Sequence, residues 1–145
     1  MKLAGAIFFS PWMDIRHEYT DAGFTSPSAS NDIVSTSFLT YGTDALSSRG
    51  QDLSSYSPNN ASEEDLARLP PSIVTIGAAE KLRDSINLFC DKLKDCERIE
   101  MAGACHDWIC KKALTNPDKY AERDRDIKRI GEWVAKRVGW TEETS

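Results

Sequence analysis

Residues 72–101 of the chain, SIVTIGAAEKLRDSINLFCDKLKDCERIEM, decide its fold. The stretch opens with the short β-branched run Ser72–Gly77, which is typical of a buried strand. The run Arg98–Ala102 near its end is a second strand candidate. Between the two runs, four apolar residues have the spacing of one face of a helix: Leu82, Ile86, Phe89 and Leu93. A strand, a helix and a strand in this order predict a βαβ unit, and therefore a parallel sheet with a right-handed crossover.

A third strand is expected near the start of the sequence. Leu3–Phe9 is a short apolar run that Pro11 stops, and a run of this length fits a buried strand better than a helix. The fold class that follows is α/β, with about three parallel strands and flanking helices. The sequence contains no internal repeat and no linker, so we expect a single domain.

Further helices are expected around this sheet. The first covers residues 31–41, with Asn31 or Asp32 as N-cap and Gly42 as its end, and its apolar residues at helical spacing are Ile33, Val34, Phe38 and Tyr41. A short helix is expected between the N-cap Ser62 and the Pro70-Pro71 pair. The last helix starts at Asn116-Pro117 and ends at Gly139, with an apolar stripe of Ile127, Ile130, Val134 and Val138.

Composition excludes several classes of protein. The 145 residues carry a formal net charge of −5 and no basic cluster, which argues against a nucleic-acid partner because phosphates require Lys and Arg. The longest apolar run is Leu3–Phe9, whereas a membrane span needs about 20 such residues. We expect no transmembrane segment and no secretory signal, which favours an intracellular location in the cytoplasm or endoplasmic reticulum.

The cysteines do not have the spacing of a metal site. None of the pairs formed by Cys90, Cys96, Cys105 and Cys110 is a C-x2-C motif. Without a secretory signal, disulfides are not favoured either, and we expect free and mostly buried thiols. No metal and no cofactor is predicted.

Charged side chains follow the second and third expected strands, at the edge where parallel sheets carry their functional loops. The loop after Gly77 holds two carboxylates, Glu80 and Asp84, and the loop after Gly103 holds His106. An isolated carboxylate is most often a solvated charge, and a lone histidine is more often structural than catalytic. A carboxylate oriented against a histidine is, however, two of the three members of a serine-hydrolase triad.

Segments along nearly the whole chain resemble the C-terminal half of an α/β hydrolase of the hormone-sensitive-lipase-like esterase and lipase family (α/β hydrolase fold-3). The matching segments are, in order, Leu3–Asp14, Tyr56–Pro58 with Leu69–Pro71, Gly77–Asp84, and Cys105–Trp108. Fungal members, including steryl acetyl hydrolase-like proteins, look nearest. By this resemblance, residues 1–145 form the C-terminal part of one α/β-hydrolase domain, in which residues 14–70 are a loop and helical excursion.

The resemblance implies a chemistry and a role for two residues. It implies hydrolysis of a small hydrophobic carboxylic ester by a Ser-His-Glu triad, with Glu80 at the acid position and His106 as the base. Asp84 is a secondary candidate. The separation, 106 − 80 = 26 residues, suits one helix and one strand in between. The triad mechanism needs no cofactor.

The chain departs from the family at the nucleophile. No serine has glycine two residues away on both sides, as the G-x-S-x-G elbow requires, and no His-Gly pair exists for the oxyanion loop. Ser10 is a candidate nucleophile by position only, and Cys105 adjoins His106 in a segment where neighbours point to opposite faces. By the resemblance, the nucleophile half lies upstream of Met1, and we expect the chain alone to be inactive.

Three interpretations remain open at this point. The first is the C-terminal part of an ester hydrolase. The second is a catalytically inactive remnant that binds a ligand or a partner. The third is an unrelated small α/β domain in which Glu80 and His106 are incidental. Losing half of a sheet exposes strand edges, so we also expect instability or self-association through an exposed edge.

Overall fold

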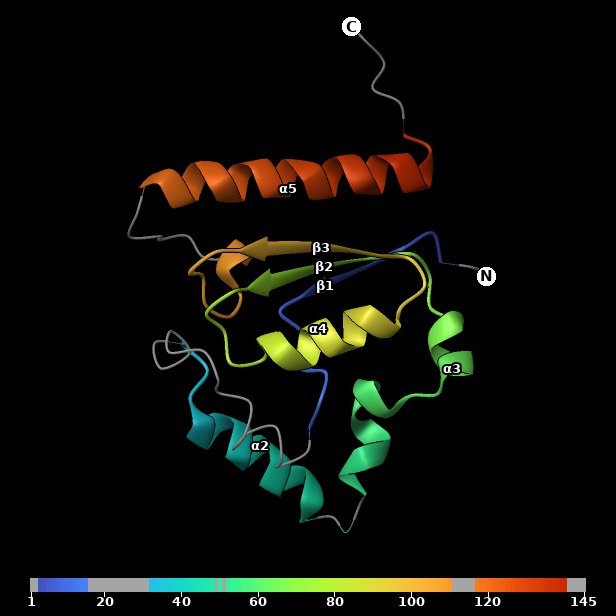
Figure 1. Ribbon diagram of the computed structural model, residues 1–145, viewed down its shortest axis with the longest axis vertical. Coiled ribbons are helices and arrows are strands. Elements are labelled where there is room, and N and C mark those ends of the chain that lie inside the picture. The colour runs from blue at the N-terminus through green and yellow to red at the C-terminus, as the bar shows by residue number, and fades with distance from the viewer. Residues whose placement is uncertain (1–2, 16–31, 49, 51, 111–116, 141–145) are drawn as a thin grey trace, which may run out of the picture.

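A three-stranded parallel sheet lies at the centre of the computed structural model, which describes residues 3–15, 32–48, 50, 52–110 and 117–140 (Figure 1). The strands are β1 (Ala6–Phe9), β2 (Ser72–Gly77) and β3 (Cys96–Met101), in the spatial order β1-β2-β3. Ser72 pairs with Ala6 on one side and with Cys96 on the other. The α/β class and the parallel pairing are confirmed.

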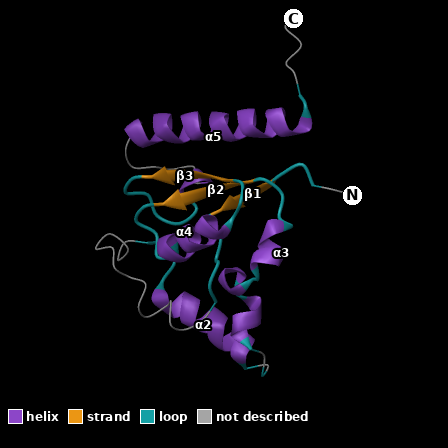
Figure 2. Cartoon of the chain, turned by 45° about the vertical axis from the view of Figure 1, so that its right-hand side comes forward, coloured by secondary structure: helices purple, strands orange, loops and turns teal. Residues whose placement is uncertain are grey.

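Helices cover both faces of the sheet, so the domain has three layers (Figure 2). Helix α4 (Arg83–Lys92) lies on one face, where Val74 and Ile76 of β2 join a core cluster with Ile86 and Phe89. Helix α5 (Pro117–Val138) lies on the other face, where Ile73 packs in a second cluster with Ile99, Met101, Trp108 and Ile130. Alternate residues of β2 thus face opposite helices, which explains its continuous apolar character.

The first expected helix begins and ends later than the sequence predicts. Helix α2 spans Thr36–Ser47, and Ser35 is its N-cap because the Ser35 hydroxyl accepts the backbone N–H of Phe38. Asn31 lies outside the described residues, and Asp32 is not the cap. Gly42 does not end the helix: a Cβ there would lie 3.0 Å from the Trp12 ring, so glycine lets α2 pack closely against that side chain.

The apolar stripe predicted for this helix is mostly wrong, and of its four residues only Val34 packs against the core cluster that contains Leu39. The buried residues of α2 are Leu39 and Thr43, one helical turn apart. Ile33, Phe38 and Tyr41 are instead 61%, 61% and 72% exposed. The spacing was helical, but the three side chains lie away from the core of the described residues.

Between α2 and β2 the chain forms 3₁₀ turns at Leu53–Tyr56 and Pro58–Asn60 and then α3 (Glu63–Ala67). The predicted cap is confirmed, since the Ser62 hydroxyl accepts the backbone N–H of Asp65. Buried Asn59 fastens this region to the rest of the fold: its backbone N–H donates to the Met13 carbonyl at 3.0 Å and its side-chain amide donates to the Ser85 carbonyl at 2.9 Å.

Helix α5 begins at Pro117 as predicted, and Gly139 follows it with a φ of +69°, the left-handed conformation that ends many helices. Its apolar stripe is buried only in the middle. Ile130 is 8% exposed, whereas Ile127 and Val138 are 46% and 60% exposed. The described residues therefore bury the middle of the stripe and leave Ile127 and Val138 largely exposed.

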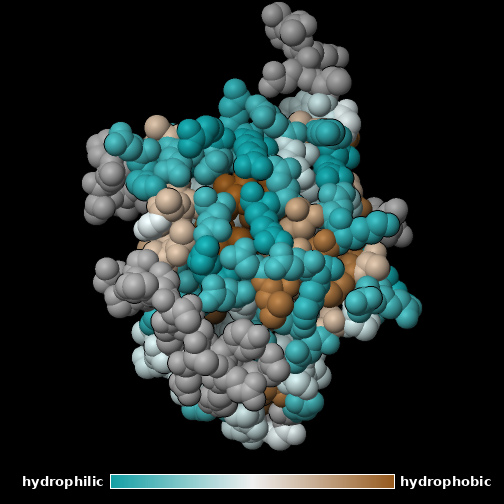
Figure 3. All heavy atoms as spheres, in the orientation of Figure 1, coloured by the Kyte–Doolittle hydropathy of each residue, from teal (hydrophilic) through white to brown (hydrophobic). Residues whose placement is uncertain are grey.

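Polar residues dominate the face seen in Figure 3, with apolar patches between them. None of the helices in the described part of the chain is both long and apolar enough to cross a membrane. The four cysteines are free: Cys90 is buried, Cys96 and Cys105 are half-buried, and Cys110 is exposed. The thiols are therefore less buried than predicted.

Candidate active site

Glu80 lies in the turn between β2 and α4, and its side chain is completely buried. The turn is held against the loop that follows β3 by backbone hydrogen bonds. The N–H of Ala78 donates to the Met101 carbonyl at 3.0 Å, and the N–H of Ala79 donates to the Ala104 carbonyl at 2.8 Å. The two loops therefore form one unit at the carboxyl ends of adjacent strands.

Gly77 makes this close contact possible. A Cβ at this position would lie 2.6 Å from both the Ala104 and the Cys105 carbonyl oxygens, which is shorter than real Cβ contacts. The acid loop can therefore reach the histidine loop only because β2 ends in glycine.

His106 lies opposite Glu80 in the loop after β3. Its Nδ1 atom is 3.9 Å from Oε2 of Glu80, and its side chain is only 18% exposed. The structure thus brings together the two residues that the sequence singles out as acid and base, although their separation exceeds that of a hydrogen bond.

The facing atoms of this pair are buried and lack hydrogen bonds within the described part of the chain. They are both carboxylate oxygens of Glu80 and Nδ1 of His106. Leaving buried polar atoms unpaired costs about 1–3 kcal/mol each. A small approach of the two side chains would pair Oε2 of Glu80 with Nδ1 of His106, and catalytic hydrogen bonds are often long in free enzymes.

Burial raises the pKa of Glu80 to about 8. The hydroxyl of Ser10 and the backbone of Gly77 lie close enough to oppose this rise in the pKa, but neither forms a hydrogen bond of good geometry with the carboxyl group. The negative charges of Asp32 and Asp107 add to the rise in the pKa. The acid is therefore protonated in this state at neutral pH.

Asp107 occupies the other side of the imidazole. Its Oδ2 atom lies 3.4 Å from Nε2 of His106, and its backbone has a φ of +54°, a left-handed conformation in which aspartate is among the tolerated residues. The N–H of Asp107 donates to the Ser10 hydroxyl at 3.1 Å. Ser10 thus supports the histidine loop, and its hydroxyl is already engaged there.

Asp84, the secondary acid candidate, lies in the first turn of α4. Its side chain is 47% exposed, and its carboxylate is 3.7 Å from the Arg83 guanidinium. Among the described residues, the carboxyl groups that lie within 4.0 Å of the His106 ring nitrogens are those of Glu80 and Asp107. The geometry therefore favours Glu80 over Asp84 as the partner of the histidine.

Asp32 is a site residue that the sequence interpretation missed. Its two carboxylate oxygens accept backbone N–H groups from Lys81 and His106, the residues next to or within the acid–histidine pair. The sequence favoured a helix cap at this position, and no local pattern indicates partners 49 and 74 residues away.

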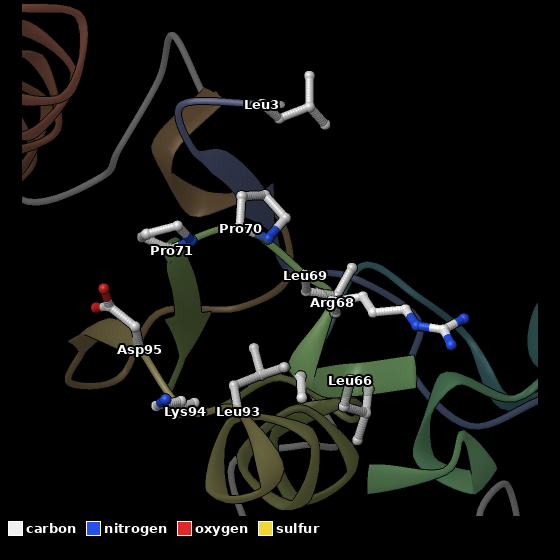
Figure 4. Close-up of a pocket in the computed structure, with 10 residues that line it drawn as sticks. Leu3, Leu66, Arg68, Leu69, Pro70, Pro71, Leu93, Lys94 and Asp95 are labelled. Carbon is white, nitrogen blue, oxygen red and sulfur yellow. The ribbon is translucent and has the colours of Figure 1, made fainter. Parts of the chain in front are cut away.

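A cavity of about 1050 Å³ lies at the opposite end of the sheet (Figure 4). Pro70 and Pro71, which precede β2, and Lys94 and Asp95, which precede β3, are among the residues that line it. Glu80 and His106 follow the carboxyl ends of these strands. The cavity is therefore separate from the candidate active site.

Comparison with known proteins shows similarity in structure but not in sequence. No protein-family model matches the chain, and no curated protein sequence matches it. Carboxyl esterase 2 from the mycorrhizal fungus Tuber melanosporum superposes with a TM-score of 0.71 and 19% identity, over 94% of this chain and 45% of the esterase. A hormone-sensitive lipase from a metagenome library gives the same values.

A bacterial protein has similar agreement. Brefeldin A esterase, described as a bacterial homologue of human hormone-sensitive lipase, superposes with a TM-score of 0.71 and 20% identity, over 96% of this chain and 41% of the esterase. Because fungal and bacterial esterases match alike, the resemblance to fungal steryl acetyl hydrolase-like proteins stays a prediction. The chain spans less than half the length of each of these enzymes. Over that length, it has the α/β-hydrolase fold of the hormone-sensitive-lipase-like esterases.

Proposed function

We propose that this chain is the acid- and base-bearing part of a carboxylic-ester hydrolase, in which Glu80 and His106 act with a serine in a Ser-His-Glu triad. The observation that carries the proposal is the juxtaposition of a buried carboxyl group and an imidazole, 3.9 Å apart, at the carboxyl ends of adjacent strands. Loops at this edge hold the functional groups of open α/β sheets. The esterase fold of the structural neighbours supports the same conclusion.

In the proposed reaction, His106 removes the proton of the serine hydroxyl through Nε2 as the serine attacks the ester carbonyl. His106 later returns this proton to the leaving alcohol. Glu80 holds the Nδ1 side of the ring and stabilises the imidazolium that forms. Since an opposite charge favours ionisation, formation of the imidazolium lowers the pKa of Glu80 from its raised value of about 8.

The nucleophile is proposed to come from polypeptide outside this sequence, because no serine in it lies in a G-x-S-x-G motif. The backbone N–H groups that stabilise the oxyanion would come from the same part of the polypeptide. The substrate class is a small hydrophobic ester. Ser10 is not proposed as the nucleophile, since it is buried and its hydroxyl accepts the Asp107 N–H.

The test is hydrolysis of p-nitrophenyl butyrate by the polypeptide that includes the residues encoded in frame before Met1. We expect G-x-S-x-G in that segment and turnover that His106→Ala lowers by about three orders of magnitude or more. Glu80→Gln should also lower kcat strongly. Asp124→Asn, which changes an exposed carboxylate on α5 that pairs with Arg123, is the matched control. Absence of the motif, or turnover unaffected by His106→Ala, overturns the proposal.

A second candidate function is a catalytically inactive module that binds a ligand or a partner. The observation that favours it is the outer edge of the sheet: β1 has one neighbour among the described strands, and Ile7 and Phe9 are 38% and 43% exposed. An open edge of this kind pairs with other strands. Self-association of the 145-residue chain in analytical ultracentrifugation supports this alternative when the longer polypeptide of the preceding test also shows no ester turnover. A stable monomer with a cooperative thermal transition contradicts it.

A further inference from the structure

The strongest observation outside the acid–histidine pair is the position of Asp32. Its Oδ2 accepts the N–H of Lys81 at 2.8 Å, and its Oδ1 accepts the N–H of His106 at 3.0 Å. One carboxylate therefore joins the loop after β2 to the loop after β3. Hydrogen bonds to an ionised acceptor are shorter and stronger than those between neutral groups.

The place of this cross-link along the two loops gives it a specific effect. Closer to the sheet, the loops are already joined by the hydrogen bond from the Ala79 N–H to the Ala104 carbonyl, at 2.8 Å. Asp32 joins them again beyond that point, at the residue after Glu80 and at His106 itself. Glu80 thus lies between the two cross-links, and His106 is held by the second one, which a side chain makes.

Asp32 is held in place by the start of α2. The helix begins at Thr36, whose hydroxyl accepts a hydrogen bond from Lys81 Nζ at 3.2 Å. Lys81 of the acid loop therefore contacts Asp32 through its backbone and the first residue of α2 through its side chain. These contacts fix the carboxylate relative to both loops.

We propose that Asp32 is a positioning residue that sets the approach of Glu80 to His106 by clamping the backbones of the acid and histidine loops together. This inference deepens the proposed ester hydrolysis and rests on it for its role in turnover, whereas the clamp itself is a property of the chain alone. Asp32 acts on the Glu80–His106 pair through the backbones of the two loops. We do not propose that it contacts substrate.

The test is nuclear magnetic resonance of the 145-residue chain and of the Asp32→Asn variant. Asparagine keeps one acceptor oxygen but presents an amide donor to the second N–H, so one of the two hydrogen bonds is lost. We expect upfield movement and faster hydrogen exchange of the Lys81 or His106 amide. We also expect a changed ¹⁵N signature of the His106 imidazole. Asp124→Asn should leave these signals unchanged.

A merely structural role is distinguished by the imidazole signature. If Asp32→Asn lowers thermal stability and leaves the His106 imidazole signals as in the wild type, the positioning role is refuted. If the variant does not fold, a pH titration of the wild-type chain tests the proposal instead. The amide shifts of Lys81 and His106 must then change with the same midpoint as the ¹³C shift of the Asp32 carboxyl carbon. Amides that do not follow it overturn the proposal.

The two proposals fail separately. Amide and imidazole changes in Asp32→Asn, combined with no ester hydrolysis by the longer polypeptide, uphold the clamp and reject the esterase function. Ester hydrolysis that depends on His106, combined with unchanged amide and imidazole signals, upholds the function and rejects the clamp.

Discussion

Nδ1 of His106 lies 3.9 Å from Oε2 of Glu80, and both atoms are buried without a hydrogen-bond partner in the described part of the structure. Two groups that could hydrogen-bond are thus held just out of reach of each other. Burial keeps the acid protonated, because it raises the pKa of Glu80 to about 8. A hydrogen bond between the two atoms therefore requires the side chains to move closer together than they are in this structure.

Glu80→Gln should change how stability depends on pH. Glu80 has a pKa of about 8 in the folded chain and 4.5 as its ordinary value, so the folded state retains a proton that the unfolded state releases between these values. The free energy of unfolding of the wild type therefore falls as pH rises from about 4.5 to about 8, by up to about 1.4 kcal/mol per pH unit. The glutamine variant lacks this loss and becomes more stable relative to the wild type across the window.

Urea unfolding at several pH values across this window measures the difference. Glu132→Gln, at a site whose side chain is 67% exposed, is the control and should give a curve parallel to that of the wild type. Parallel curves for Glu80→Gln and the wild type would show that Glu80 ionises normally in the folded chain.

Gly77→Ala should destabilise the chain by about 1–3 kcal/mol, because its Cβ would meet two backbone carbonyl oxygens at 2.6 Å. The matched control is Gly131→Ala, on the exposed side of α5, where a Cβ meets nothing within 4 Å. There, alanine should stabilise the helix by about 0.5–1 kcal/mol. Chemical unfolding of both variants checks the opposite signs, and equal effects contradict the close approach of the two loops.

Asn59→Ala should lower the free energy of unfolding by about 1–3 kcal/mol, since it removes a buried amide that donates to the Ser85 carbonyl at 2.9 Å. The neighbouring Asn60 is exposed and its amide donates to the Ser54 carbonyl at 3.1 Å. Asn60→Ala should change stability by less than about 0.5 kcal/mol. Thermal unfolding of the pair tests whether Asn59 fastens the segment before β2, and similar losses for both would argue against it.

Asp32→Asn in the longer, active polypeptide should lower kcat by about tenfold to a hundredfold with a smaller change in KM, because misplacement of a catalytic pair affects the transition state more than binding. Steady-state kinetics with p-nitrophenyl esters measures the split. A rise in KM alone would assign Asp32 to substrate binding instead of positioning.

The elements with local signals could be predicted from the sequence. Strand β2 has the predicted bounds, because a β-branched run between Pro71 and a glycine carries its own start and end. The cap at Ser62 is likewise confirmed. The start of α2 was missed because Asp32 and Ser35 are both good N-cap residues, and only tertiary contacts decide between them.

The juxtaposition of Glu80 and His106 could be predicted from the sequence, but the residues that support the two loops could not. Glu80 and His106 follow two strands whose parallel pairing brings their ends together, so their juxtaposition follows from the topology. The contributions of Ser10, Asp32 and Asp107 depend on side chains reaching a distant loop. Such contacts have no periodicity and no spacing that a single sequence displays.

The links made by Asp32 also have a consequence for the order of folding. They join residues 49 and 74 positions apart, so the chain must close long loops before either bond can form. The βαβ unit needs shorter closures and can be in place earlier. We therefore expect Asp32 substitutions to have low φ-values, speeding unfolding with little effect on the folding rate, so that the acid–histidine geometry is completed late on the folding pathway.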